Sequence, residues 1–316
     1  MIINKVPEVI YEFGNEKKIK RLLYKSKEPI LLKMVNFTDK FSIDFFIEQS
    51  RGLTTYSVFD NSQFVEHKTG DITSVLKDIK NNKPYRIFGQ YYPRWMCEEV
   101  EKQVPLWQDI PFRPRFCNKM VKTLFFLGGK GSNTGMHYDR EYPSILHLCL
   151  SGKKRLLLFT KKQNDFLYKT PFVGDSLIDF SKPIEEIYKQ FPNLKKAQGY
   201  EVVLEKGDML FMPKKCWHYT EYIDASAAAT YVFYPNKLDQ LYGSFTGLFY
   251  LGYKENSGFQ ICNWPFFKKF DLLYARSSGV NKFFLKVVEK ILFIFLLPAV
   301  SVSAYISHKI RPRKCY

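Results

Sequence analysis

The stretch that decides the fold is Gly128-Gly129-Lys130-Gly131-Ser132-Asn133-Thr134-Gly135-Met136-His137-Tyr138-Asp139, a glycine-rich loop that runs into a His-x-Asp pair. Side chains at positions i and i+2 of a β-strand point to the same side, so His137 and Asp139 can converge on one metal ion. A strand must therefore end here, and a neighbouring strand must bring a third ligand to the same place.

A third ligand is available far downstream at His218, which stands in Cys216-Trp217-His218-Tyr219 after a Pro213-Lys214-Lys215 turn. Two histidines and one carboxylate form the facial triad that holds Fe(II) and leaves the opposite face open for an organic cosubstrate and oxygen. His137, Asp139 and His218 are therefore the predicted iron ligands and catalytic residues. The alternative is that both histidines are structural groups, satisfied within a sheet.

The text around these residues resembles the JmjC, or cupin-like, 2-oxoglutarate oxygenases, and among them the asparaginyl hydroxylase that inhibits hypoxia-inducible factor. The resemblance rests on a combination of motifs and fades at both ends of the chain. These motifs are a threonine three residues before the His-x-Asp pair (Thr134), a Gly-x-Lys on the next strand (Gly152-Lys153-Lys154), Gly199-Tyr200-Glu201 followed by Gly207-Asp208 and Pro213, and Trp217-His218.

The resemblance implies a mainly β fold. Its core would be a double-stranded β-helix, the cupin-like jelly roll, with an N-terminal α/β layer and C-terminal helices. The sequence agrees, because many short apolar runs are separated by Gly, Asn, Asp and Pro, which favours a double-sheet jelly roll over a parallel sheet. The insertion at about 165–198 is expected to cover one mouth of the barrel.

The resemblance also implies the activity. The chain would be an Fe(II)- and 2-oxoglutarate-dependent dioxygenase that uses O2 and hydroxylates a side chain of a protein or peptide, with succinate and CO2 as coproducts. One alternative is a hydroxylase of a small molecule, a lipid or a tRNA base. Another is a cupin-like binding protein without catalysis. Lysine demethylation is less favoured, because no reader module or zinc site accompanies the barrel.

A cosubstrate with two carboxylates needs a cation at the far end of its pocket. In the family pattern, the second residue after the glycine binds that distal carboxylate, which gives the role to Lys154. Thr134 matches a threonine that bonds the same carboxylate. The competing interpretations are a surface lysine pair, Lys153 and Lys154, and an ordinary turn threonine.

Gln90 matches a glutamine that touches cosubstrate and substrate in the family. Two positions depart from the pattern. Phe88 stands where the family has a tyrosine, with Tyr91 or Tyr92 as candidate replacements, and Thr230-Tyr231-Val232-Phe233 lacks the family's late asparagine. His147 is expected to be a packed core histidine.

The composition and charge of the chain limit the kinds of binding partner that are expected. Of the 316 residues, 46% are hydrophobic and 17% aromatic, as expected of a well-packed globular protein, and the formal net charge is +17. The lysines are scattered without a long arginine-rich block, so a solvated basic surface is favoured over a nucleic-acid partner. Four segments are expected: an extension at 1–25, the oxygenase domain at 26–236, a helical region at 237–290 and an apolar tail with a basic end at 291–316.

Six cysteines without a CxxC pair, and an N-terminus without a secretory signal, indicate a reducing, cytoplasmic location. Residues 291–307 carry no charge, and two interpretations stay open for them. They are at the lower length limit of a transmembrane helix, which would make the protein membrane-associated. They could equally be a helix in a homodimer interface, because C-terminal helices mediate dimerisation in the hydroxylase that this chain resembles.

Overall fold

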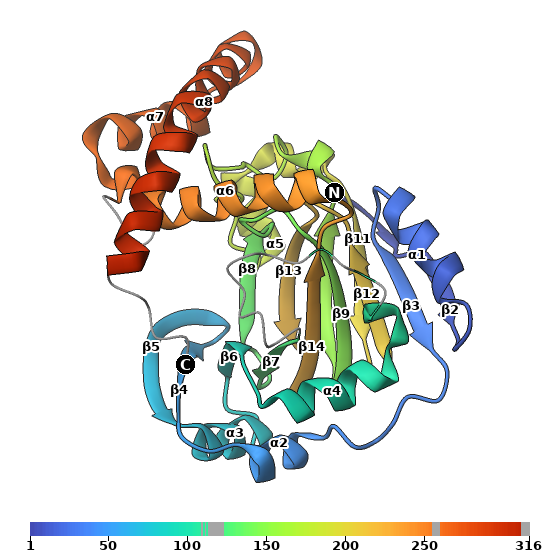
Figure 1. Ribbon diagram of the computed structural model, residues 1–316. Coiled ribbons are helices and arrows are strands. Elements are labelled where there is room, and N and C mark those ends of the chain that lie inside the picture. Colours follow the sequence, from blue (N-terminus) through green and yellow to red (C-terminus); the bar gives the residue numbers. More distant parts are fainter. Residues whose placement is uncertain (109, 111, 113–122, 255–259, 311–316) are drawn as a thin grey trace.

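The computed structural model describes residues 1–108, 110, 112, 123–254 and 260–310. Its centre consists of two β-sheets that pack face to face (Figure 1). The five-stranded sheet has the order β1 (Ile2–Lys5), β11 (Gln198–Leu204), β10 (Lys154–Phe159), β13 (Trp217–Tyr222) and β8 (Asn133–His137). The nine-stranded sheet has the order β2 (Glu8–Tyr11), β3 (Ile30–Met34), β12 (Asp208–Met212), β9 (Ser144–Ser151), β14 (Ser226–Phe233), β7 (Leu124–Gly128), β6 (Tyr85–Gln90), β4 (Leu53–Asp60) and β5 (Gln63–Asp71).

Apolar side chains fill one part of the space between the sheets. Leu156 and Leu158 of β10 pack in one buried cluster with Ile145 and Cys149 of β9 and with Leu210 of β12. Alternate residues of each strand therefore face the opposite sheet, as a jelly roll requires. The expected cupin-like core with C-terminal helices is confirmed.

Four helices cover the outer face of the nine-stranded sheet: α1 (Glu16–Lys25), α2 (Ile43–Gln49), α3 (Ile72–Lys80) and α4 (Arg94–Gln103) (Figure 1). The helix α3 has Asp71 as its cap, because the Asp71 carboxylate accepts a hydrogen bond from the backbone N–H of Ser74. Trp107 is buried here and stacks on Tyr231.

The insertion at 165–198 was expected to cover one mouth of the barrel. It packs on the outer face of the five-stranded sheet, where Leu167, Ile178 and Leu194 share one buried cluster with Leu157 and Trp217. The reason is the alternation of β10 and β13, which points large apolar side chains to this outer face and so requires a cover. The insertion contains α5 (Ile184–Gln190). The short 3-10 helices among the described residues are Pro105–Trp107, Lys161–Gln163, Pro192–Lys196 and Ile261–Asn263.

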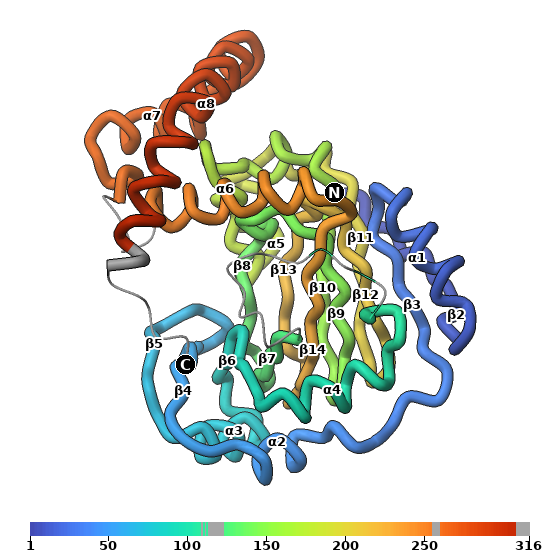
Figure 2. Tube along the Cα trace, viewed as in Figure 1, coloured from blue at the N-terminus to red at the C-terminus, as the bar shows by residue number. Residues whose placement is uncertain are grey.

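The first 25 residues, interpreted as an extension, contribute a strand to each sheet. β1 pairs in parallel with β11, and β2 pairs in parallel with β3. β11, the partner of β1, lies far downstream in the sequence, so no local pattern indicates the pairing. The path is easiest to follow in the tube view, where the N-terminal segment lies beside β11 and β3 (Figure 2).

Three helices follow the barrel: α6 (Lys237–Tyr253), α7 (Pro265–Arg276) and α8 (Gly279–Ile310). They bury a shared aromatic cluster that also includes Phe172 and Val173 of the insertion. α8 is attached to the insertion by Glu289, whose carboxylate accepts hydrogen bonds from the Phe172 N–H (2.7 Å), Lys169 Nζ (2.9 Å) and Tyr274 Oη (2.9 Å). Burial acts to raise the pKa of Glu289, but Lys169 and the bonds it accepts outweigh burial and lower it.

The apolar tail belongs to α8, a single helix that also includes residues 279–290. Among the described residues, no helix combines the length and the apolar character needed to cross a membrane. The transmembrane interpretation of residues 291–307 is thus not borne out in this part of the chain. Val300 and Ala304 instead lie against Gly252 of α6, and the Ser301 hydroxyl donates to the Phe245 carbonyl. The basic end beyond residue 310 lies outside the described residues.

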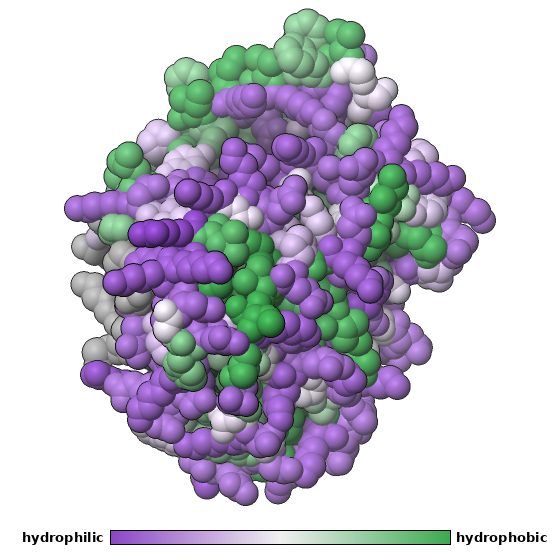
Figure 3. Space-filling model, turned by 90° about the vertical axis from the view of Figure 1, so that its right-hand side faces the viewer, coloured by the Kyte–Doolittle hydropathy of each residue, from purple (hydrophilic) through white to green (hydrophobic). Residues whose placement is uncertain are grey.

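The other sides of α8 expose many large apolar side chains. In the space-filling view, apolar surface lies at the top of the molecule, where Figure 1 has α7 and α8 (Figure 3). The exposed members on α8 are Val280, Phe283, Phe284, Val287, Val288, Ile291, Ile294, Phe295, Val302, Tyr305 and Ile306. Contiguous apolar surface of this kind marks an interaction site.

Candidate metal centre

β13 brings the two predicted histidines together. It lies between β10 and β8, with His218 directly opposite His137 of β8 and opposite Leu158 of β10. The register shifts next to this pair, because Thr220 pairs with Thr134. Between the two pairs the chain advances three residues along β8 but only two along β13. This bulge turns His137 and Thr134 to the same face of the sheet, which strict alternation would not allow.

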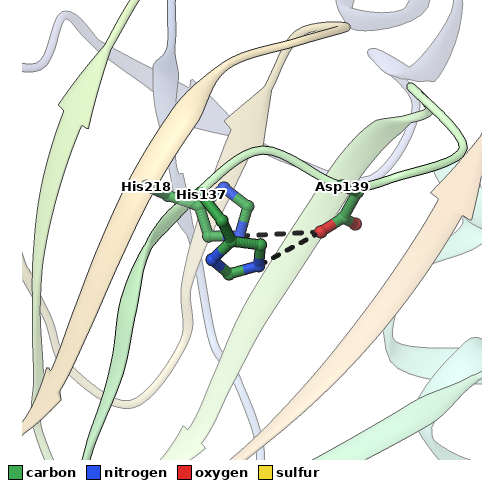
Figure 4. A group of neighbouring side chains, drawn as sticks. All are labelled: His137, Asp139 and His218. Carbon is green, nitrogen blue, oxygen red and sulfur yellow. Dashed lines mark ion pairs between the residues drawn. The ribbon is translucent and has the colours of Figure 1, made fainter. Parts of the chain in front are cut away.

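The three predicted ligands converge. Oδ1 of Asp139 lies 3.5 Å from Nε2 of His137 and 3.8 Å from Nε2 of His218. The two imidazole rings are 4.2 Å apart, and both direct Nε2 toward the same carboxylate oxygen (Figure 4). One ligand atom from each of the three residues lies within 4.8 Å of the others, a spacing that suits one bound ion.

Backbone carbonyls fix the orientation of both rings. Nδ1 of His137 donates to the Gly135 carbonyl at 2.8 Å, and Nδ1 of His218 donates to the Cys216 carbonyl at 3.1 Å. A carbonyl oxygen only accepts, so the proton of each neutral ring stands on Nδ1 and the Nε2 lone pair is left for a metal. Such outer partners orient metal ligands in known sites.

The pKa shifts of His218 and Asp139, two of the three candidate ligands, also suit a divalent cation. Burial, with the nearby His137, lowers the pKa of His218 to about 4. Burial acts to raise the pKa of Asp139, but the hydrogen bond with His137 and the charges of His218 and Arg140 lower it overall. At neutral pH, His218 is therefore neutral and Asp139 is a carboxylate, as metal ligation requires.

Lys154 lies farther along the same face. Its side chain is fully buried and shares the inner face of β10 with Leu156 and Leu158. Nζ donates to Tyr222 Oη at 3.1 Å and lies 4.2 Å from the centre of that ring. Tyr222 pairs with Lys154 across the two strands, so the hydroxyl that Phe88 does not supply is present from β13.

Thr134 and Arg86 complete this end. Arg86 of β6 donates from Nη1 to the Thr134 hydroxyl at 2.7 Å and also to the Asn133 carbonyl. The charge of Arg86 acts on both Lys154 and Tyr222. Four polar groups from four different strands therefore stand around one position. Arg86 and Tyr222 were missed in the sequence, because no motif signals them and only the register brings them here.

Gln90 is not brought to this group. Its position pairs with Phe125, which belongs to the core on the outer face of the nine-stranded sheet. Its amide accepts from the Thr54 hydroxyl at 3.0 Å and donates to the Tyr91 carbonyl at 3.1 Å. Tyr92, a candidate replacement for the family tyrosine, instead bonds Ser50 at 2.9 Å.

His147 is buried as expected, but its environment is polar. It faces the space between the sheets with Ile145 and Cys149, and Nδ1 lies 2.6 Å from the Thr230 hydroxyl. Its Nε2 has no protein partner, and neither do the buried Nε of Arg86 and Oγ of Ser226. Buried polar groups without partners are rare, so their gathering here fits a space that receives a polar ligand.

The described residues therefore fit a divalent metal and a small dicarboxylate. The donor set of two histidines and one carboxylate suits Fe(II), and the fully buried Lys154 of the same sheet and the partly buried Arg86 of the other sheet lie at the other end. The unpartnered buried atoms are the observation that speaks for a polar occupant between the two ends.

Comparison with known proteins places the chain among related sequences. The sequence model described as "Cupin-like domain" matches residues 9–240. The human HSPB1-associated protein 1 is 36% identical over 120 residues, which is 37% of this chain and 24% of that protein. The human tRNA wybutosine-synthesizing protein 5 is 26% identical over 222 residues, 62% of this chain and 68% of that protein.

A third relative is the Jumonji C domain-containing protein 5 of Drosophila melanogaster, 33% identical over 141 residues, which is 42% of this chain and 34% of that protein. The chain aligns with only 24% of the length of the human HSPB1-associated protein 1. What those proteins do as wholes is therefore not carried over by the alignment alone.

Removing one ligand should abolish tight metal binding. We expect His218→Ala to weaken the binding of Mn(II), used as a redox-stable probe, by more than about 100-fold, because even outer partners of metal ligands contribute 10- to 100-fold. Isothermal titration calorimetry on metal-free protein measures the effect. His67→Ala is the control, since His67 lies on β5 and bonds Ser57. Equal affinities of His218→Ala and the wild type would refute the proposed ligand set.

Proposed function

The chain belongs to the cupin-like (JmjC) domain family, and from this premise we propose that it is an Fe(II)- and 2-oxoglutarate-dependent oxygenase that hydroxylates a side chain of a protein or peptide. Proteins of this family are commonly oxygenases. The activity of this chain and its substrate class are our inference.

One observation supports the proposal most strongly. The two-histidine, one-carboxylate group and a buried lysine stand on the same inner face of one sheet, joined by β13. A surface lysine would not be fully buried without a carboxylate partner, so the alternative interpretation of Lys153 and Lys154 explains the structure less well. A ligand with an acidic group would supply the carboxylate partner that Lys154 lacks.

The roles of the side chains follow from their positions. His137, Asp139 and His218 would hold the metal, and Lys154 would bind the distal carboxylate of 2-oxoglutarate, with Tyr222 and Thr134 donating hydrogen bonds beside it. When bound, the metal and cosubstrate supply the oxidising chemistry. The protein holds the cosubstrate in one orientation, and the two packed sheets keep bulk water from it. Gln90 would need to leave its contacts with Thr54 and Tyr91 to take part.

A tRNA base is the alternative substrate. The likeness to tRNA wybutosine-synthesizing protein 5 covers 68% of that protein, and the net charge of +17 would favour a polyanion. A binding protein without catalysis is the alternative from another class. The presence of three metal ligands and Lys154 argues against it.

We also propose that the exposed apolar face of α8 binds a second copy of this chain. The exposed residues run along most of the helix, and the resemblance to a hydroxylase that dimerises through C-terminal helices motivates this choice. A membrane surface is the other occupant that such a face would suit.

The activity is tested in two steps. Metal-free protein titrated anaerobically with Fe(II) and 2-oxoglutarate should develop the visible charge-transfer band of the chelate, and Asp139→Ala should abolish it. When air is admitted, the protein loaded with Fe(II) and 2-oxoglutarate should form succinate. It should also increase the mass of one protein in a cell lysate by that of one oxygen atom. Succinate without any modified protein, but with modified tRNA, would select the alternative substrate. A missing band in well-folded protein would favour the binding protein.

Cosubstrate binding should take up a proton above neutral pH. Burial, with the Arg86 charge, lowers the pKa of Lys154 to about 7, so the free lysine is mostly neutral at pH 8. A bound carboxylate raises this pKa again, so 2-oxoglutarate affinity should fall as the pH rises above 7, and proton uptake should vanish below it. Calorimetry of Mn(II)-loaded protein in two buffers of different ionisation enthalpy measures the uptake.

The titratable groups next to Lys154 should not contribute to the measured proton uptake. Burial raises the pKa of Cys149 to about 12, raises that of Tyr222 and lowers that of His147 well below its usual value. Arg86 keeps its charge throughout. Lys154→Arg should bind 2-oxoglutarate without proton uptake, and persistent uptake in that variant would assign the proton to another group.

The oligomer is tested by light scattering after gel filtration. The wild type should have twice the chain mass of 37.3 kDa, and Phe295→Glu should have the single mass, because Phe295 is 72% exposed on α8. Phe13→Glu is the control, since Phe13 is equally exposed far from α8. A monomeric wild type that sediments with anionic lipid vesicles would replace the second copy by a membrane surface.

A further inference from the structure

Arg86 lies at the far end of the candidate site, and no sequence motif assigns it a role. It lies on β6 of the nine-stranded sheet, opposite Gly128 of β7, and so reaches the site from the sheet that carries no metal ligand. Its guanidinium is held between two aromatic rings, with its carbon 5.4 Å from the centre of Phe59 and 5.3 Å from that of Phe88. These contacts fix the plane of the guanidinium.

The hydrogen bonds of Arg86 leave one edge of the guanidinium open. Nη1 donates to the Asn133 carbonyl and to the Thr134 hydroxyl. Nη2 makes one long contact of 3.4 Å with Ser57, and Nε has no partner although it is buried. The Nε–Nη2 edge is one of the two forks with which arginine binds a carboxylate through a pair of parallel hydrogen bonds.

The local charge is unbalanced. Lys154 is fully buried, and burial lowers the pKa of Arg86 as well. Within the described part of the chain, no carboxylate forms an ion pair with either side chain, whereas Arg155 next door is paired with Glu201 and Glu221 on the outer face. A fully buried lysine and a partly buried arginine that lack a carboxylate partner are costly, so the site fits an acidic ligand that touches both side chains.

We propose that Arg86 is a specificity-determining residue of the cosubstrate pocket, where its Nε–Nη2 edge and Lys154 together bind the distal carboxylate of a 2-oxo dicarboxylic acid. The chemical class of the ligand is therefore a 2-oxo diacid, and a 2-oxo monoacid of the same length binds more weakly because it cannot accept the hydrogen bonds of these two side chains. This inference rests on the proposed function.

A purely structural role makes a different prediction. Arg86 also joins β6 to β8 through the Asn133 carbonyl, so its removal could loosen the pocket as a whole. Loss of the contact between β6 and β8 would weaken the binding of the diacid and of the monoacid alike, because both ligands would contact the metal through the same 2-oxo acid group. A specificity role changes only the ligand that carries the distal carboxylate.

The experiment compares two ligands on Mn(II)-loaded protein by calorimetry: 2-oxoglutarate and 2-oxopentanoate, which has the same chain length without the distal carboxylate. Arg86→Met should weaken the binding of 2-oxoglutarate by roughly 10- to 100-fold, the worth of a hydrogen bond to a charged group, and leave the weaker binding of 2-oxopentanoate unchanged. Arg86→Lys should recover part of the loss. Arg155→Met is the matched control and should leave both affinities as in the wild type.

The outcomes separate this inference from the proposed function. If the wild type binds 2-oxoglutarate and Arg86→Met binds it equally well, or loses both ligands in parallel, the role of Arg86 is wrong and the oxygenase proposal stands. If the metal-loaded wild type binds neither ligand, the proposed function itself fails. Thermal unfolding of each variant verifies that the compared proteins are folded.

Discussion

The candidate site depends on the pairing of β13 with β10 on one side and β8 on the other. This pairing sets His218 beside His137 at one end and Tyr222 beside Lys154 at the other. Because register fixes the face of every side chain in a strand, a slip of one residue would turn His218 and Tyr222 to the outer face together. The candidate metal ligands and the proposed carboxylate-binding group are thus set by the same ladder of hydrogen bonds.

The space between the sheets is divided between two kinds of chemistry. Leucines, Ile145 and Cys149 close one part of it as an ordinary apolar core. The remainder collects buried polar atoms that lack partners, among them Nε2 of His147 and Nε of Arg86. Each such atom costs stability in the ligand-free protein, and proteins tolerate this cost at functional sites. The apolar part stabilises the frame that keeps the polar part open to a ligand.

The sequence predicts the part of the site that follows from local spacing. His137 and Asp139 are two residues apart, and Lys154 follows a glycine at a strand start, so alternation and family pattern suffice for them. Thr134 faces the same way only because of a bulge that depends on its partner strand. Arg86 and Tyr222 could not be found, since β6 and β13 meet only through the packing of the two sheets. Gln90 shows the reverse: it matches a motif, yet the register turns it to the outer core.

The same limit applies to the fold. The helix at 72–80 carries its own cap and apolar face, and its bounds could be predicted. The strands at 2–5 and 8–11 are short, and their partners lie elsewhere in the sequence. β5 has almost every side chain exposed, so it shows none of the alternation that identifies a half-buried strand. Interactions distant in sequence decide these elements, and a local pattern cannot contain them.

The attachment of the insertion to the C-terminal helices bears on how the molecule can be divided. The backbone of residues 174–176 pairs along the edge of β8 at His137. Asp175 forms an ion pair with Lys254 at the end of α6, and the Glu289 carboxylate of α8 accepts a hydrogen bond from the Phe172 N–H. The family domain ends at residue 240, before both of these attachments. A piece cut at that boundary would contain every metal ligand and still lack the supports of the ligand-bearing edge. A shortened protein meant to preserve the candidate metal centre should therefore extend past residue 240 and include α6 and α8.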